Sequence, residues 1–148
     1  MHSVKTRPGH THIVRWGADM DYYRQLETQH PVADRHGFIS TGKEMRDMPT
    51  LVNAFNRTNA PLDIYVCESY NGFSYSELFR SLGVHDNVKV HYICGAVHRE
   101  MSMKVNGAAC VVICCRKTNY TVGLTTVVEA LALGIPVICS RNPQMPMD

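Results

Sequence analysis

The segment TVGLTTVVEALALGIPVICS, from Thr121 to Ser140, decides the fold class of this chain. Its first half carries apolar residues at helical spacing, and Gly134 is a typical stop signal for the helix predicted over residues 124–133. The stretch PVIC that follows is apolar and partly β-branched, which is typical of a buried strand. Helix, glycine and strand in this order predict one unit of an alternating α/β fold.

The same alternation of strand and helix begins at Gly37 and continues along the chain. The stretch ACVVICC, residues 109–115, is apolar at every position, which is typical of a central strand covered on both faces. We expect about five strands, at 37–41, 62–68, 87–94, 109–115 and 136–139, with helices at 48–58, 74–83, 98–107 and 124–133. The predicted fold class is α/β, a Rossmann-like parallel sheet with helices on both faces.

The first 24 residues show no regular pattern and predict a linker that ends on a tight turn at Gly17–Asp19. Residues 25–148 are then predicted to form one Rossmann-like domain. The chain ends soon after the fifth expected strand, so we expect a domain truncated at its C-terminus.

Composition and charge exclude several classes of protein. The net charge of +2 is too small to indicate a nucleic-acid partner. No apolar run approaches the roughly 18 residues of a membrane helix, and the N-terminus lacks the apolar core of a secretion signal. The six cysteines lie mostly in strand-like runs without a CxxC pair, which predicts no metal site and reduced, mostly buried thiols in a cytoplasmic protein.

A single carboxylate, Glu129, stands out on the helix predicted over residues 124–133. Helical spacing predicts that Leu124, Val127, Val128, Leu131 and Ala132 face the sheet. Thr125, Thr126 and Glu129 then share the other side. The helix begins beyond the carboxyl end of a central strand, so its free N–H groups suit phosphates and Glu129 suits a ribose diol. A solvated outer face, with Glu129 serving solubility, is the alternative.

A second anion site is predicted in STGKEMRD, residues 40–47. A strand end, the turn at Gly42 and the cations Lys43 and Arg46 together supply backbone donors and positive charge. Ordinary surface cations are the alternative. The stretch lacks P-loop spacing, and no GxGxxG follows the first strand, which makes a nicotinamide dinucleotide a poor candidate.

Four stretches in this order resemble the donor-binding half of a GT-B-fold glycosyltransferase of the retaining group 1 (family four) type. They are WGADMDYY, STGKEMRDMPTLVNAF, NVKVHYICGAVHREM and TTVVEALALGIPVICS, and the last is the most specific. The likeness runs from about Val14 to the end of the chain. It implies that the domain at 25–148 is the C-terminal half of a GT-B fold and binds a nucleotide sugar.

The resemblance implies a role for each matching residue. Glu129 would bind the ribose, the helix start at Gly123, Thr125 and Thr126 would hold the diphosphate, and the turn at Gly42 with Lys43 and Arg46 would neutralise the leaving diphosphate. Gly95 and Val97, in the loop 94–97, would line the base. Thr121 occupies the position of an earlier family glutamate, so the contact to the sugar differs or is absent.

The function implied is transfer of a hexose from a nucleoside-diphosphate sugar, UDP first, without metal or cofactor. The acceptor would be a glycan or a lipid-linked molecule, bound by a separate N-terminal domain. Polysaccharide biosynthesis in the cytoplasm, with peripheral membrane association of the full-length enzyme, is compatible with that reading. Two alternatives stay open: a sugar-nucleotide epimerase of GT-B fold and a non-catalytic Rossmann-like binding module.

Overall fold

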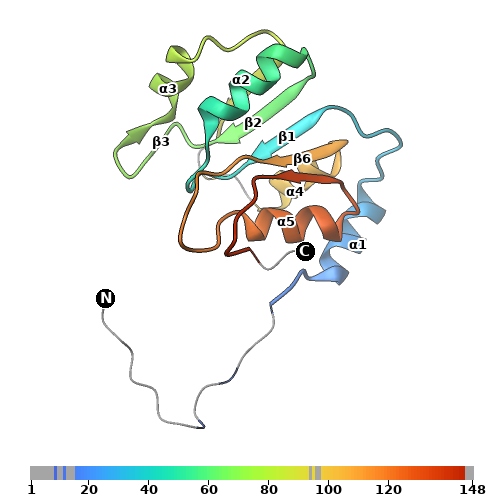
Figure 1. Ribbon diagram of the computed structural model, residues 1–148. Helices are drawn as coiled ribbons and strands as arrows, with labels where there is room; N and C mark the ends of the chain where they lie inside the picture. The colour runs from blue at the N-terminus through green and yellow to red at the C-terminus, as the bar shows by residue number, and fades with distance from the viewer. Residues whose placement is uncertain (1–8, 10–11, 13–15, 94, 96–97, 146–148) are drawn as a thin grey trace.

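A five-stranded parallel sheet forms the centre of the protein, in the order β5-β2-β1-β6-β7 (Figure 1). The computed structural model describes residues 9, 12, 16–93, 95 and 98–145. The strands of the sheet are β1 (Phe38–Thr41), β2 (Leu62–Val66), β5 (Val88–Tyr92), β6 (Cys110–Ile113) and β7 (Val137–Cys139). All four pairings are parallel, which confirms the predicted Rossmann-like α/β class.

Helices cover both faces of the sheet (Figure 1). They are α1 (Met20–Gln29), α2 (Met48–Thr58), α3 (Tyr75–Ser81), α4 (His98–Asn106) and α5 (Leu124–Ala132). One buried hydrophobic cluster joins α2 and α3 to the sheet, and a second joins α1, α4 and α5 to the opposite face. The central strand β6 contributes Val112 to the first cluster and Val111 and Ile113 to the second, as expected of a strand that is apolar on both faces.

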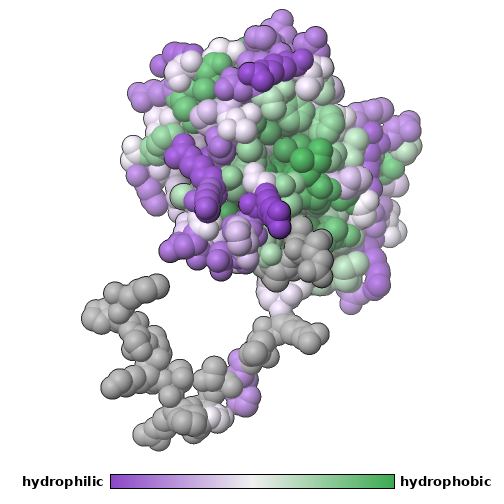
Figure 2. Space-filling view, in the orientation of Figure 1, coloured by the Kyte–Doolittle hydropathy of each residue, from purple (hydrophilic) through white to green (hydrophobic). Residues whose placement is uncertain are grey.

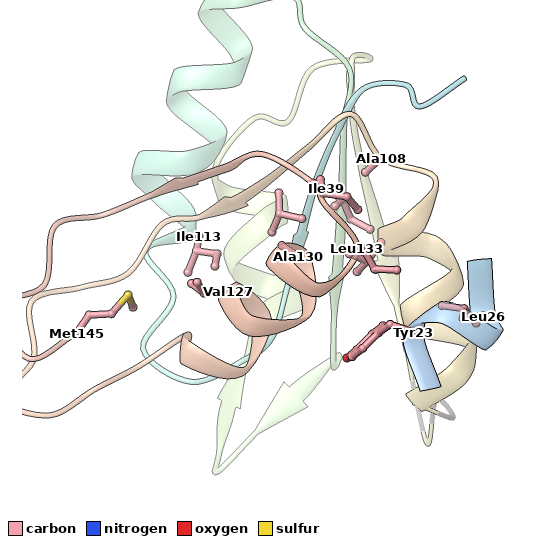
Figure 3. Close-up of a cluster of buried hydrophobic side chains, with 12 residues drawn as sticks. Tyr23, Leu26, Ile39, Ala108, Ile113, Val127, Ala130, Leu133 and Met145 are labelled. Carbon is pink, nitrogen blue, oxygen red and sulfur yellow. The ribbon is translucent and has the colours of Figure 1, made fainter. Parts of the chain in front are cut away.

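The cluster beneath α1, α4 and α5 shows how the N-terminal helix belongs to the domain (Figure 3). Tyr23 and Leu26 of α1 are 6% and 2% exposed, and they pack with Ala130 and Leu133 from the α5 region. The boundary predicted at about Arg24 is therefore wrong, because α1 already begins at Met20. Asp19 caps this helix by accepting a hydrogen bond from the Tyr22 N–H at 3.1 Å, a start signal that the sequence interpretation missed.

A short hairpin follows β2 and was not predicted. It pairs β3 (Ser69–Tyr70) with β4 (Phe73–Ser74), so that Tyr70 lies opposite Phe73. The two turn residues, Asn71 and Gly72, have φ values of 49° and 77°. Asn-Gly favours this left-handed pair of conformations, which suits the twist of a tight hairpin.

The buried face of α5 differs from the predicted one. Thr126 and Ala130 are 7% and 0% exposed, whereas Leu131 is 64% exposed. The prediction assumed one neighbour, the sheet, but α5 also packs against α4 and Tyr23 of α1. With neighbours on two sides, the small side chains turn inward where the helices approach, and Leu131 turns outward.

The thiols are less buried than predicted. Cys110 is buried, while Cys67, Cys114, Cys115 and Cys139 are half-buried. Cys94 lies outside the described residues. The four half-buried thiols lie at the carboxyl ends of β2, β6 and β7, where strands give way to loops and coverage by helices ends.

An apolar surface lies over β6 and β7 beside α2 (Figure 2). A groove of about 270 Å³ between α2 and these strands is lined by Phe55, Val112 and Ile138 among others. Ile138 is 57% exposed. No helix among the described residues covers β7 on this face.

Candidate functional site

The strand order reverses between β1 and β6, because the chain proceeds from β1 toward β5 on one side and from β6 toward β7 on the other. In open α/β sheets, ligands bind at the carboxyl ends of the strands beside such a reversal. Here the loops at residues 42–47 and 114–123 meet at that edge. The Asp47 N–H donates to the Cys114 carbonyl at 2.9 Å, and the Arg116 N–H donates to the Met45 carbonyl at 2.8 Å. We call this contact the loop crossing.

Arg46 is the centre of the loop crossing. The residue is 7% exposed, and its guanidinium donates to the carbonyls of Thr41 and Glu44 at 3.0–3.2 Å. It also donates to Cys115 Sγ at 3.3 Å. These bonds use most of its N–H groups, so Arg46 supports the two loops and adds positive charge, with little capacity left to bind a ligand directly.

Glycine is required at two positions beside Arg46, at Gly42 by Arg46 itself and at Gly123 by Ile113. A Cβ added at Gly42, where φ is 96°, would collide with the Arg46 guanidinium. A Cβ added at Gly123, where φ is 81°, would lie 2.8 Å from Ile113 Cγ2 and 3.6 Å from Arg46 Nη1. The structure therefore brings Gly123 close to Gly42 and Arg46, from which it is distant in the sequence.

The N-terminus of α5 begins directly at the loop crossing. Gly123 is its N-cap and provides no side chain to bond the first N–H groups of the helix. Thr125 is exposed at this end, while Thr126 is buried. Backbone N–H groups in the first turn of a helix are suitable donors to an anion, but they need a ligand-binding surface beside them to form a site.

A cavity of about 450 Å³ provides that surface. It lies among the first turns of α1, α4 and α5, and we call it the first cavity. Thr125, Thr126 and Glu129 line it from α5, with Tyr22 and Tyr23 from α1, His98 from α4 and the segment 16–19 completing the wall. The structure thus joins the three predicted residues of α5 with four aromatic rings, a juxtaposition that the sequence interpretation did not foresee.

Glu129 is held in the first cavity by a serine that sequence reasoning missed. Ser102, on α4, is 0% exposed and donates from Oγ to Glu129 Oε1 at 2.6 Å. Glu129 forms no salt bridge within the described part of the chain. One carboxylate oxygen is therefore oriented by the protein, and the group keeps the capacity to accept bonds from a ligand.

The same carboxylate affects the pKa of Tyr23. Burial, followed by the nearby negative charge of Glu129, raises the pKa of Tyr23 to about 12, while a hydrogen bond with Ser102 acts in the opposite direction. The phenol therefore stays protonated at neutral pH. Asp19 and Glu129 give the wall of the first cavity two carboxylates against one histidine, His98, so this cavity suits hydroxyl groups better than phosphates.

A second cavity, of about 320 Å³, lies on the other side of the loop crossing. The loop after β1 contributes Lys43, Glu44 and Arg46, and the loop after β6 contributes Arg116 and Tyr120. The β3–β4 hairpin adds Tyr70 and Phe73. With three cations and one carboxylate, its charge is opposite in sign to that of the first cavity.

Thr121 and Gly95 line neither cavity. Thr121 is exposed, and its Oγ1 donates to the Gln144 carbonyl at 2.6 Å. Gly95 is exposed with a φ of 65° and contributes to the wall of neither cavity. Val97 lies outside the described residues. Within residues 16–93 and 98–145, no cluster of three or more His, Cys, Asp or Glu side chains could hold a metal ion.

Comparison of the chain with protein-family models finds no match, and a search among curated proteins finds none either. None of the helices that the structure describes has the length and apolar character needed to cross a bilayer. The function proposed below therefore rests on the geometry of the two cavities.

Proposed function

We propose that this domain binds a nucleoside-diphosphate sugar, UDP first, as the donor-binding half of a retaining glycosyltransferase. The observation that carries the proposal is the pairing of Glu129 with the uncapped N-terminus of α5 at the reversal of strand order. A carboxylate accepts hydrogen bonds from both hydroxyls of a ribose, and the helix N-terminus attracts the adjoining diphosphate.

The charges of the two cavities orient the donor. The ribose and base lie in the first cavity, where Trp16 is 59% exposed and offers an aromatic face to the base. The diphosphate lies along the first turn of α5, toward Lys43 and the buried charge of Arg46. Cations and backbone N–H groups placed there stabilise the negative charge that develops on the leaving diphosphate.

The proposed reaction transfers a hexose to a glycan or lipid-linked acceptor that a second domain would position. Acceptor positioning matters because holding two reactants together supplies a large part of the rate of a bimolecular transfer. We place the protein in the cytoplasm, where its thiols stay reduced. A non-catalytic nucleotide-binding module would share the donor site and would lack the transfer.

Glu129→Gln tests the proposal. Glutamine keeps an oxygen that accepts from Ser102, so the thermal stability of the unliganded protein should barely change. The loss of charge weakens the bonds to the ribose, and the dissociation constant for UDP should rise about tenfold or more. Titration calorimetry without divalent metal, with GDP and ADP for comparison, measures this effect.

Glu77→Gln is the matched control, because Glu77 is exposed on α3 and lines neither cavity. It should leave the affinity for UDP unchanged. The proposal is wrong if millimolar UDP, GDP and ADP give no binding heat with the wild-type protein. Equal UDP affinity in the wild type and in Glu129→Gln would remove Glu129 from the site.

A further inference from the structure

The wall of the second cavity carries two cations on loops that are hydrogen-bonded to each other. The loop crossing places the β1 loop beside the β6 loop, with Arg46 and Cys115 paired in antiparallel fashion. The Tyr75 hydroxyl donates to the Lys43 carbonyl and so fixes the backbone that carries this lysine. Lys43 and Arg116 therefore face the cavity from adjacent, mutually bonded segments.

These two cations have little internal compensation. Neither Lys43 nor Arg116 forms a salt bridge among residues 16–93 and 98–145. The one carboxylate in the wall, Glu44, already accepts a hydrogen bond from the Tyr120 hydroxyl at 3.1 Å. The surface thus keeps an excess of positive charge in a recess, where a ligand anion would be less screened than on a flat surface.

Aromatic rings line the same recess. The Lys43 ammonium lies 4.2 Å from the centre of the Tyr70 ring, and Phe73 packs edge-on against Tyr75 with ring centres 5.0 Å apart. Phe73 and Tyr120 are each 44% exposed. Aromatic faces pack well against the C–H face of a sugar ring, while a few fixed polar groups set its orientation.

The second cavity lies close to the start of α5, where the proposed donor site begins. Arg46 lines the second cavity and lies against Gly123, two residues before Thr125 of the first cavity. A donor with its ribose at Glu129 and its diphosphate at this helix turn would extend its sugar into the second cavity.

We propose that the second cavity receives the sugar of the donor and favours a hexose carrying a carboxylate, a uronic acid, over its neutral counterpart. Lys43 and Arg116 bind the sugar carboxylate, and the aromatic rings hold the sugar ring. The inference rests on the proposed donor function and goes further, because it names the class of sugar.

UDP-glucuronate and UDP-glucose test the inference, because they differ only in the carboxylate or hydroxymethyl group at the sugar C6. The wild-type protein should bind UDP-glucuronate about tenfold more tightly in titration calorimetry. Arg116→Gln and Lys43→Gln should each reduce this ratio, and the double variant should bring it close to one. Both ligands contain the same UDP group, so any effect of Lys43 on diphosphate binding cancels from the ratio of the two affinities.

Lys89→Gln is the control. Lys89 is exposed on β5 and does not line the second cavity, so the substitution removes one positive charge without changing the wall of that cavity. It should leave the ratio unchanged, and circular dichroism checks that every variant is folded. If the protein binds UDP but binds UDP-glucuronate and UDP-glucose with equal affinity, the inference is wrong and the donor function stands. A preference that survives in the double variant would also overturn it, and no binding of UDP at all would remove both proposals.

Discussion

At the scale of single residues, Glu129 is the lone carboxylate of the otherwise apolar helix α5. The residue is half-buried, receives one hydrogen bond from buried Ser102 and faces the first cavity. A carboxylate serving only solubility needs no buried donor to orient it. The arrangement instead resembles a binding group held ready by a supporting side chain.

Ser102→Ala tests that supporting role. Removing the donor leaves Glu129 half-buried without its partner, so the free energy of unfolding should fall by about 1 kcal/mol. The affinity for UDP should also fall several-fold, because the carboxylate is no longer held in one orientation. Urea unfolding and titration calorimetry measure the two effects, with Ser81→Ala, at an exposed position on α3, as the control. A loss of stability with unchanged UDP affinity would make Ser102 purely structural.

The raised pKa of Tyr23 predicts that the free energy of unfolding depends on pH in the alkaline range. Its folded pKa, raised from 10.0 to about 12, exceeds the unfolded value, so the native state keeps a proton that the unfolded chain has lost. This contribution to stability is complete below about pH 10 and disappears as the pH rises toward 12. Tyr23→Phe removes the titrating group and should make the unfolding free energy fall less steeply with pH in that window.

Urea unfolding at several pH values between 9.5 and 12 measures the slope. Tyr92→Phe is the matched control, because the Tyr92 ring is 45% exposed on β5. If Tyr23→Phe and Tyr92→Phe lose stability with equal slopes, the charge of Glu129 and the burial of the phenol have no effect on the Tyr23 proton.

At the scale of elements, Arg35 joins the ends of three helices. It donates from Nε to the Asn106 carbonyl at 3.0 Å and from Nη2 to the Leu133 carbonyl at 2.9 Å. These carbonyls lie at the C-termini of α4 and α5, where the helix dipole favours a cation. Glu27 of α1 lies 3.4 Å from the same guanidinium. Arg35 therefore fixes the far ends of the helices whose first turns form the first cavity.

Arg35→Ala should lower the free energy of unfolding by about 2 kcal/mol, because two helix-terminal carbonyls lose a charged donor. Arg35→Lys should recover only part of the loss, since one ammonium cannot reach every acceptor that the planar guanidinium spans. Urea unfolding measures both variants beside Arg80→Ala, an exposed arginine on α3. Equal stabilities of Arg35→Ala and Arg80→Ala would contradict a joining role for Arg35.

At the scale of the whole molecule, two chemically different cavities lie on either side of the loop crossing. The acidic first cavity contains Glu129 and Asp19, and the basic second cavity contains Lys43 and Arg116. Arg46 lines the second cavity, and the start of α5 lines the first. In the proposed function, this polarity gives the donor one preferred direction, with its hydroxyl-rich end in the first cavity and its anionic groups toward the second.

The sequence by itself determined the α/β class and the parallel sheet. Strands such as ACVVICC and helices ended by glycines carry strong local signals, because burial on two faces and left-handed turns restrict residue type. It also predicts that Lys43 and Glu129 lie near the carboxyl edge of the sheet, because that edge follows from the order of strands and helices. The Asn-Gly hairpin and the Asp19 cap have equally local sequence signals, and the prediction from sequence did not include them.

Only the tertiary structure decided which of these residues meet. The partnership of Ser102 with Glu129 joins two helices, and the packing of Gly42 and Gly123 around Arg46 joins two loops. The exposure of Leu131 and the burial of Thr126 likewise depend on α1 and α4 as second neighbours of α5. Periodicity gives the faces of one helix, but contacts between distant segments follow from how all elements pack together, and no local pattern contains that information.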